Sequence, residues 1–209
     1  MSINYQNLNE LLKCIETKSD TKLLVVTKKQ KIEDIIELHN KGIRMFGENR
    51  VQEAQSKFQS FSNLNKIELH LIGPLQTNKV KAAIKLFNVI QTIDRPKLVD
   101  EIVKNLSDSS KTKDFFIQVN IGKEDQKAGV LKKDLKDLYN YSIEKKINIT
   151  GLMCIPPNVS DSSNFFEEMV DLRDQINVNL KLSMGMSNDY KTALNFHTNI
   201  IRIGSLIFK

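Results

Sequence analysis

The 209-residue sequence has few of the residues that mark secreted, membrane or metal-binding proteins. It contains only two cysteines, Cys14 and Cys154, in an otherwise cytosolic-looking composition, so we expect reduced thiols and a cytoplasmic location. No apolar run is long enough to span a membrane, and the N-terminus lacks a signal-peptide pattern. The histidines His39, His70 and His197 have no metal-ligand spacing to one another or to the cysteines, so we expect no metal site.

Arginine is also scarce, although the formal net charge is +6. The chain has 26 lysines but only five arginines, and the lysines are interleaved with acidic residues along its whole length. A basic surface can bind phosphate backbones, yet no RNA-binding aromatic motif accompanies these lysines. We therefore interpret the charge as a compositional bias and expect no nucleic-acid partner.

The sequence lacks linkers, low-complexity tracts and internal repeats, so its length predicts one domain spanning 1–209, with an N-terminal helix in 1–20 and a barrel in 21–209. The expected strands are 23–27, 43–46, 68–72, 88–92, 114–121, 147–153, 180–182 and 199–203. The expected helices are 4–17, 32–40, 49–61, 77–86, 96–106, 132–144, 160–176 and 189–195. This alternation predicts an α/β fold, a (β/α)8 TIM barrel with an extra N-terminal helix. A doubly wound sheet is disfavoured because no glycine-rich dinucleotide turn follows the first strand.

Small residues follow the last two expected strands. The first turn reads Ser183-Met184-Gly185-Met186-Ser187, and the second reads Gly204-Ser205. Each is expected to open a helix, where exposed backbone N–H groups and a hydroxyl favour an anion. Because barrel folds hold phosphate after strands seven and eight, the two turns together predict a phosphate site.

Lys28 and Arg202 lie at the ends of the first and last expected strands. Lys28 should emerge at the barrel rim with its stem packed on an apolar wall, where loss of solvation would suit a Schiff-base amine; the alternative is a solvated strand-end lysine. Arg202 alternates with Ile201 and Ile203, so it faces away from them. A buried arginine needs a partner, either a carboxylate inside the barrel or a ligand.

Three further residues have a structural and a functional interpretation. Asn49 could cap a helix, His70 could be a hydrogen-bonded interior histidine, and Met184 could be packing. For His70, which lies inside the third expected strand, the alternative is a catalytic residue.

Seven blocks occur in the order found in one known family. They are Val25–Lys28, Phe46–Glu53, His70–Lys79, Thr92–Asp94, Gln118–Ile121 with Lys127–Gly129, Gly151–Met153, and Leu182–Ser187 with Arg202–Ser205. The chain resembles the YggS/PROSC group of pyridoxal 5′-phosphate (PLP) homeostasis proteins from about Leu23 to Phe208. The resemblance implies a barrel like that of bacterial alanine racemase.

The resemblance also implies roles for single residues. Lys28 would be the PLP Schiff-base lysine, Arg202 would face the pyridine nitrogen, and Asn49 would lie near the cofactor ring. Ser187, Gly204 and Ser205 would bind the phosphate, and Met184 joins this cofactor-binding set. Thr27 and Ser205 replace a usual serine and threonine, and Leu69 replaces a usual tryptophan. The short terminal regions predict a ring of helices that is incomplete near its seam.

The expected function is intracellular PLP homeostasis without catalytic residues. Arginine keeps the pyridine nitrogen unprotonated and the ring a poor electron sink, and the second domain that supplies a tyrosine base in racemases is missing. PLP-dependent apoenzymes are candidate acceptors, and a monomer is expected. The main alternative is a PLP-dependent amino-acid racemase or lyase that uses His70 or a lysine as base. A PLP-free barrel enzyme for a small phosphate compound also stays open.

Overall fold

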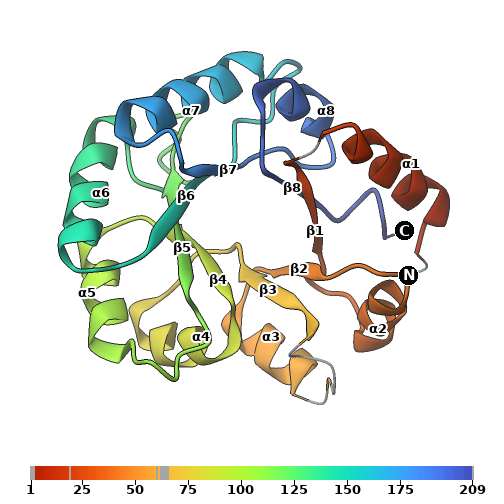
Figure 1. The fold of residues 1–209 in the computed structure, drawn as a ribbon, viewed down its shortest axis with the longest axis horizontal. Helices are drawn as coiled ribbons and strands as arrows, with labels where there is room; N and C mark the ends of the chain where they lie inside the picture. Colours follow the sequence, from red (N-terminus) through yellow and green to blue (C-terminus); the bar gives the residue numbers. More distant parts are fainter. Residues whose placement is uncertain (1–2, 19, 60, 62–65, 209) are drawn as a thin grey trace.

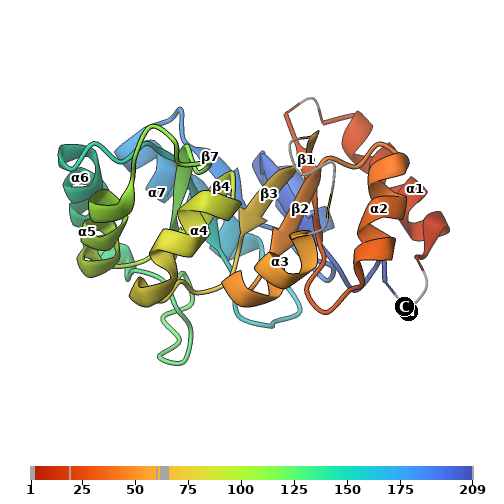
Figure 2. The same cartoon turned by 90° about the horizontal axis from the view of Figure 1, so that it is seen from below.

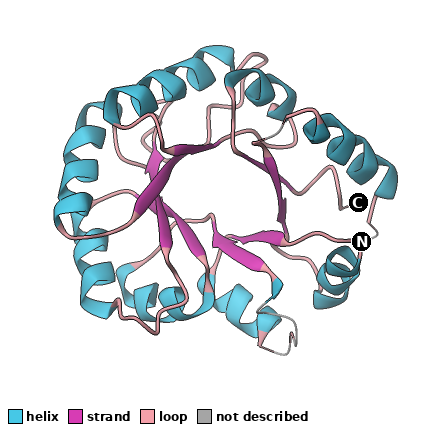
Figure 3. Cartoon of the chain, in the orientation of Figure 1, coloured by secondary structure: helices cyan, strands magenta, loops and turns pink. Residues whose placement is uncertain are grey.

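A computed structural model describes residues 3–18, 20–59, 61 and 66–208. The expected domain bounds, residues 1 and 209, lie outside this part. Parallel strands form a closed barrel in chain order, surrounded by helices (Figure 1; Figure 3). The strands are β1 (Lys22–Val26), β2 (Met45–Glu48), β3 (Glu68–Leu71), β4 (Val89–Ile93), β5 (Asp114–Val119), β6 (Ile149–Cys154), β7 (Lys181–Ser183) and β8 (Ile200–Ile203). The predicted TIM-barrel fold is confirmed.

The helices fall close to their predicted places. They are α1 (Tyr5–Glu16), α2 (Ile32–Asn40), α3 (Val51–Phe58), α4 (Val80–Leu86), α5 (Pro96–Asn105), α6 (Leu135–Glu144), α7 (Ser163–Ile176) and α8 (Tyr190–Ala193). Short 3-10 turns, Thr77–Lys79, Lys132–Asp134 and Leu194–Phe196, adjoin α4, α6 and α8. Local chemistry sets several ends: Asn4 caps α1 by accepting from the Asn7 backbone N–H, and Pro96 begins α5.

The second strand was predicted at 43–46, two residues too early. Ile43 is buried but lies before the strand. Strand β2 instead ends in Gly47 and Glu48, which are both buried. A glycine and an acid do not resemble the end of a buried strand, which is why an apolar pattern misplaces it. The following helix is also shorter than predicted, and residue 60 lies outside the described part.

Two apolar layers hold the barrel. The larger lies between the strands and the helices, and the smaller fills the barrel interior with Leu24, Met45, Ile72, Val89, Phe116, Met153 and Ile200. The interior also contains buried polar side chains, His70, Gln91, Ser183 and Arg202. A TIM-barrel interior is a packed core and not a pore, so these polar groups must satisfy one another there.

Helix α1 closes the ring of helices between α8 and α2 (Figure 1). It is fixed to the last residues of the chain: the Asn4 N–H donates to the Ile207 carbonyl oxygen at 2.7 Å, and Asn7 Nδ2 donates to that of Leu206 at 2.8 Å. Tyr5 Oη donates to Glu37 of α2. The expectation of an incomplete ring was therefore wrong, because the N-terminal helix occupies the gap after β8.

The connections after β5 and β6 extend well beyond the strands on one side of the barrel (Figure 2). This is the face where the strands have their carboxyl ends, and where TIM-barrel sites lie. In the described part of the chain, no helix is long and apolar enough to cross a membrane.

Candidate functional site

A cavity of about 440 Å³ opens at the carboxyl ends of the strands. It brings together five of the seven predicted site residues, from three separate parts of the sequence: Lys28, Ser187, Arg202, Gly204 and Ser205. Its remaining wall comes mainly from the loop after β6, residues 155–162, and from the β7–α8 turn.

The two small-residue turns lie against each other because β7 and β8 are hydrogen-bonded at their ends. The Arg202 N–H donates to the Gly185 carbonyl oxygen at 2.9 Å, and the Met184 N–H donates to that of Ile200 at 3.1 Å. Gly185 has a φ of +94°, and a Cβ there would lie 2.7 Å from Ala193 Cβ, so the turn requires glycine.

Both turns keep donors available to a ligand. Among the described residues, neither the N–H groups nor the hydroxyls of Ser187 and Ser205 have a hydrogen-bond partner. The prediction that each turn opens a helix was only partly right, since α8 has four residues and Gly204 begins a single turn closed by the N–H groups of Ile207 and Phe208. The free N–H groups can still bind an oxyanion, because an N–H donor does not depend on a long helix.

Lys28 lies exposed on the cavity wall, so the expected loss of solvation around it is wrong for this structure. It makes no hydrogen bond or ion pair with any residue that the structure describes. Its amine is therefore available to a molecule in the cavity.

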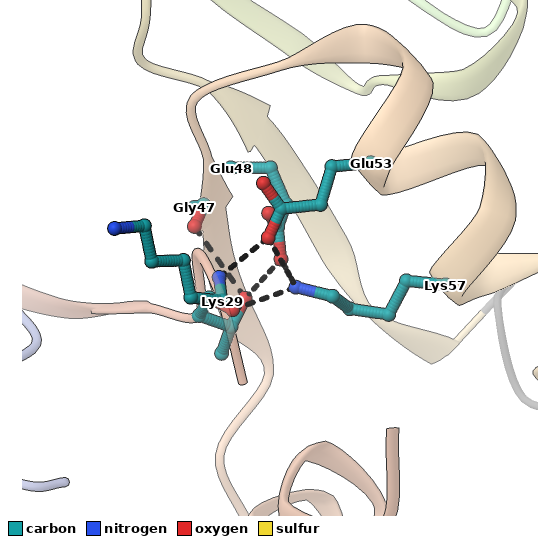
Figure 4. Close-up of polar contacts among 6 residues, drawn as sticks. Lys29, Gly47, Glu48, Glu53 and Lys57 are labelled. Atoms are coloured by element: carbon teal, nitrogen blue, oxygen red, sulfur yellow. Dashed lines mark hydrogen bonds and ion pairs between the residues drawn. The ribbon is translucent and has the colours of Figure 1, made fainter. Parts of the chain in front are cut away.

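A largely buried ionic cluster holds the backbone of Thr27 and Lys29, the two neighbours of Lys28; Figure 4 shows Lys29, Glu48, Glu53 and Lys57 in this cluster. Lys57 Nζ, from α3, donates to the Thr27 carbonyl oxygen at 2.7 Å, to Glu48 Oε1 at 2.7 Å and to Glu53 Oε1 at 3.2 Å. Thr27 Oγ1 donates to Glu48 Oε1 at 2.7 Å, and the Lys29 N–H donates to Glu53 Oε1 at 2.5 Å. The strand end that carries Lys28 is thus tied to β2 and α3.

The two carboxyl groups of this cluster differ in environment. The Glu48 side chain is fully buried, and burial raises its pKa although Lys57 and Thr27 oppose the shift. Burial also acts on Glu53, but the Lys29 N–H and Lys57 more than compensate, so the pKa of Glu53 is lowered. Glu48 is consequently the member of the cluster that depends most on Lys57.

Arg202 is 3% exposed and points into the barrel interior beneath the cavity. Its Nη1 donates to Ser183 Oγ at 2.9 Å and its Nη2 to the Cys154 carbonyl oxygen at 2.7 Å. No carboxylate pairs with it in the described residues, so the first alternative, an internal ion pair, is wrong. Burial lowers its pKa, and the nearby charge of Asp189 partly opposes this shift. A guanidinium stays protonated, and a buried cation with no carboxylate in direct contact favours a ligand as its partner.

Asn49 and Met184 do not line the cavity. Met184 is fully buried in the outer apolar layer. Asn49 is half-buried, and its backbone lies so close to Gly73 that a Cβ on Gly73 would be 2.1 Å from the Asn49 carbonyl oxygen. Asn49 does not cap α3 either, since the N-cap is Arg50.

His70 lies at the opposite end of the barrel from Lys28, hydrogen-bonded to Glu68 and Gln91. Its proposed use as a base beside the cofactor is therefore wrong.

Reasoning from single residues missed Asp189, whose Oδ1 accepts from the Met186 N–H at 2.6 Å on the cavity wall. It also missed Lys127, which bonds to the Pro156 carbonyl oxygen and to Glu124. No cluster of three potential metal ligands occurs among the residues described.

Comparison with known proteins gives consistent matches over most of the chain. The sequence matches the family described as alanine racemase, N-terminal domain, over residues 3–209. It is 41% identical to the pyridoxal phosphate homeostasis protein of Aquifex aeolicus over 196 residues, covering 90% of this chain and 86% of that protein. A structure of PipY from Synechococcus elongatus with PLP bound has a TM-score of 0.85 at 28% identity, covering 98% of this chain and 99% of that one. An alanine racemase of Clostridium difficile, at 16% identity and TM-score 0.75, shares the fold over 57% of its own length.

Proposed function

The chain belongs to the family of pyridoxal phosphate homeostasis proteins, which has the fold of the alanine racemase N-terminal domain, and we propose that it binds PLP in the cavity at the carboxyl ends of its strands. The observation that carries this proposal is a buried Arg202, with no carboxylate in direct contact among the described residues, beneath a cavity walled by Lys28 and two donor-rich turns. The PLP-bound PipY structure supports the choice of ligand.

The residues fit the three functional groups of PLP. Ser187, Gly204 and Ser205 offer backbone and hydroxyl donors for the phosphate. Arg202 supplies a hydrogen-bond donor for the pyridine nitrogen, and the exposed amine of Lys28 can condense with the aldehyde to form a Schiff base, releasing one water. The cavity of about 440 Å³ is within the size range of small-molecule sites.

We propose that the protein holds and delivers PLP with negligible catalysis. Bound PLP supplies an electron sink, which is strong only when its ring nitrogen is protonated. A guanidinium at that nitrogen donates and cannot be the acid that protonates it. The described residues that line the cavity include no tyrosine or histidine, and the candidate bases Lys127 and Asp189 are already hydrogen-bonded. PLP-dependent apoenzymes are the proposed acceptors, and the proposed working form is a monomer.

The decisive experiment is a visible spectrum of the purified protein with PLP, before and after borohydride. We expect a yellow protein whose colour is lost as borohydride fixes the cofactor, with the pyridoxyl group on the peptide that contains Lys28. Lys28→Ala should form no such adduct, while Lys31→Ala, at an exposed lysine outside the cavity, should behave as wild type. An equal adduct in Lys28→Ala would refute the assignment of Lys28.

The lack of catalysis is tested separately. Chiral analysis of alanine and serine after long incubation with the PLP-loaded protein should show no change beyond that caused by free PLP. Substantial turnover would favour the racemase or lyase alternative and leave the binding proposal intact.

A further inference from the structure

A second cavity, of about 280 Å³, opens at the other end of the barrel. It is lined by the first residue of every strand except β6, which contributes its second residue, Thr150. This end of a TIM barrel ordinarily serves stability, because the interior beneath it is packed. A cavity there needs an explanation other than the cofactor site, which lies at the opposite face.

Apart from Asp20, which precedes β1, the charged residues at this mouth begin strands on two different sides, one cationic and one anionic. Lys22 and Lys181 act on Glu68 across the mouth and help to lower its pKa, after its hydrogen bond to His70. Lys22 begins β1 and Lys181 begins β7, so they flank Ile200 of β8. Across the barrel, Glu68 begins β3 and Asp114 begins β5, on the two sides of Val89 of β4. The floor between the two sides is apolar, formed by Met45, Val89, Phe116 and Ile200.

The cationic side has spare donors. The ammonium groups of Lys22 and Lys181 make no ion pair or hydrogen bond with the described residues. The Thr150 hydroxyl on the same wall also has no hydrogen-bond partner in the described structure. The anionic side is better satisfied, since Glu68 accepts from His70 at 2.8 Å and Asp114 accepts from Asn148 at 2.9 Å, but each carboxylate still has acceptor capacity.

We propose that this mouth binds a small zwitterion, a free α-amino acid with an apolar side chain. Its carboxylate would face Lys22 and Lys181, its ammonium would face Glu68 and Asp114, and its side chain would cover the apolar floor. A simple anion fits less well, because Asp20 also lines the cavity and the carboxylates outnumber the lysines by three to two.

A chain of hydrogen bonds connects this mouth to the cofactor site through the barrel interior. Arg202 Nη1 donates to Ser183 Oγ at 2.9 Å, and Ser183 Oγ donates to Gln91 Oε1 at 2.7 Å. Gln91 Nε2 bonds to His70 Nδ1 at 2.7 Å, and His70 Nε2 to Glu68 Oε1 at 2.8 Å. With the His70 proton on Nε2, every bond donates in one direction, from the guanidinium to the carboxylate, and such chains polarise along their length.

Glu68 therefore lines the mouth and is also the last acceptor in the series of hydrogen bonds that starts at Arg202. An ammonium that pairs with Glu68 weakens its hold on His70 and so reduces the polarisation at Arg202. This coupling, unlike the site itself, rests on the proposed binding of PLP against Arg202. By reciprocity, bound cofactor and bound amino acid change each other's affinity by the same factor.

The test uses protein whose PLP has been fixed by borohydride, because a reduced adduct cannot exchange with an added amine. L-Leucine titrated by calorimetry should bind with one site per chain, whereas 4-methylpentanoate and 3-methylbutylamine, which each lack one charged group, should bind at least about tenfold more weakly. The double variant Lys22→Gln/Lys181→Gln should lose at least about tenfold in leucine affinity. Lys85→Gln/Lys104→Gln, at exposed helix positions, should bind as wild type.

Coupling is read from the fluorescence of the fixed pyridoxyl group. Leucine should change this fluorescence in the parent protein but not in Gln91→Leu, because that variant interrupts the series of hydrogen bonds while it leaves leucine binding in place. Ser183→Ala interrupts the next hydrogen bond and is used if Gln91→Leu does not fold. No calorimetric binding, or equal binding by Lys22→Gln/Lys181→Gln, would overturn the site. Binding without a fluorescence change would overturn only the coupling. Titration of PLP-free protein decides the site even if the protein does not bind PLP.

Discussion

Replacing Lys57 by methionine should destabilise the protein far more than its position on a surface helix suggests. The Lys57 side chain is 8% exposed, and its ammonium donates to oxygens of Thr27, Glu48 and Glu53 (Figure 4). Methionine keeps the apolar stem but leaves the Glu48 carboxylate fully buried with only Thr27 as donor.

Removal of one partner of a buried ion pair costs about 3–5 kcal/mol in unfolding free energy. The loss should depend on pH in a defined direction. Burial raises the folded-state pKa of Glu48 above its usual value near 4.5, and removal of Lys57 raises it further. The folded state then binds the proton more tightly, so stability falls as pH rises above 4.5 towards the folded pKa. The deficit of Lys57→Met should therefore be smallest at acidic pH and should grow as pH rises.

Urea unfolding at pH 5 and pH 8 measures both effects. Lys85→Met, at an exposed lysine, is the control and should change stability by less than about 0.5 kcal/mol. Adding Glu48→Gln to Lys57→Met should recover part of the loss, because the uncompensated charge is gone. A deficit below about 1 kcal/mol, or one of equal size at both pH values, would show that the cluster does not stabilise this strand end.

Three other predictions follow from the site. Ser187→Ala and Ser205→Ala should each weaken PLP binding about three- to tenfold in a fluorescence titration, the effect of one hydrogen bond; unchanged affinity in both would remove the hydroxyls from the site. Gly185→Ala should lower the unfolding free energy by about 1–3 kcal/mol because of its positive φ and the close Ala193 Cβ, and wild-type stability in urea would contradict this turn geometry. Burial raises the pKa of the Cys154 thiol to about 12, so iodoacetamide at pH 8 should modify Cys14 and spare Cys154 in the folded protein. Mass spectrometry checks this, and rapid alkylation of Cys154 in the folded protein would disprove its burial.

The sequence was sufficient for the barrel because its helix and strand periods alternate regularly. The strand ends were harder where burial depends on pairing and not on hydrophobicity. Glu48 is the clearest case: it ends β2 in a fully buried position only because Lys57, nine residues later, neutralises it. A pattern of apolar residues contains no information about such a partner.

In the candidate site, too, some residues could be placed from the sequence and others could not. Lys28, Arg202 and the two turns could be predicted because they lie at strand ends, where the fold brings distant residues together. His70 could not be placed by that rule, since it lies inside β3 and its side chain lines the cavity at the amino-terminal end of the barrel. Its link to Arg202 runs through Gln91 and Ser183, which show no distinctive local pattern.

The pairing of β1 with β8 places the proposed cofactor site across the closure of the barrel. Lys28 follows the first strand and Ser205 the last, so the two sides of the cavity meet only when nearly the whole chain has folded. Such long-range closure is slow relative to local helix formation, because most of the chain must be ordered first. A ligand that contacts both sides binds the closed barrel alone, and at a concentration of 100 times its dissociation constant it adds about 2.7 kcal/mol to the stability of that state. The supply of cofactor would then set how long each folded molecule persists, making the lifetime of the protein itself a measure of cofactor abundance.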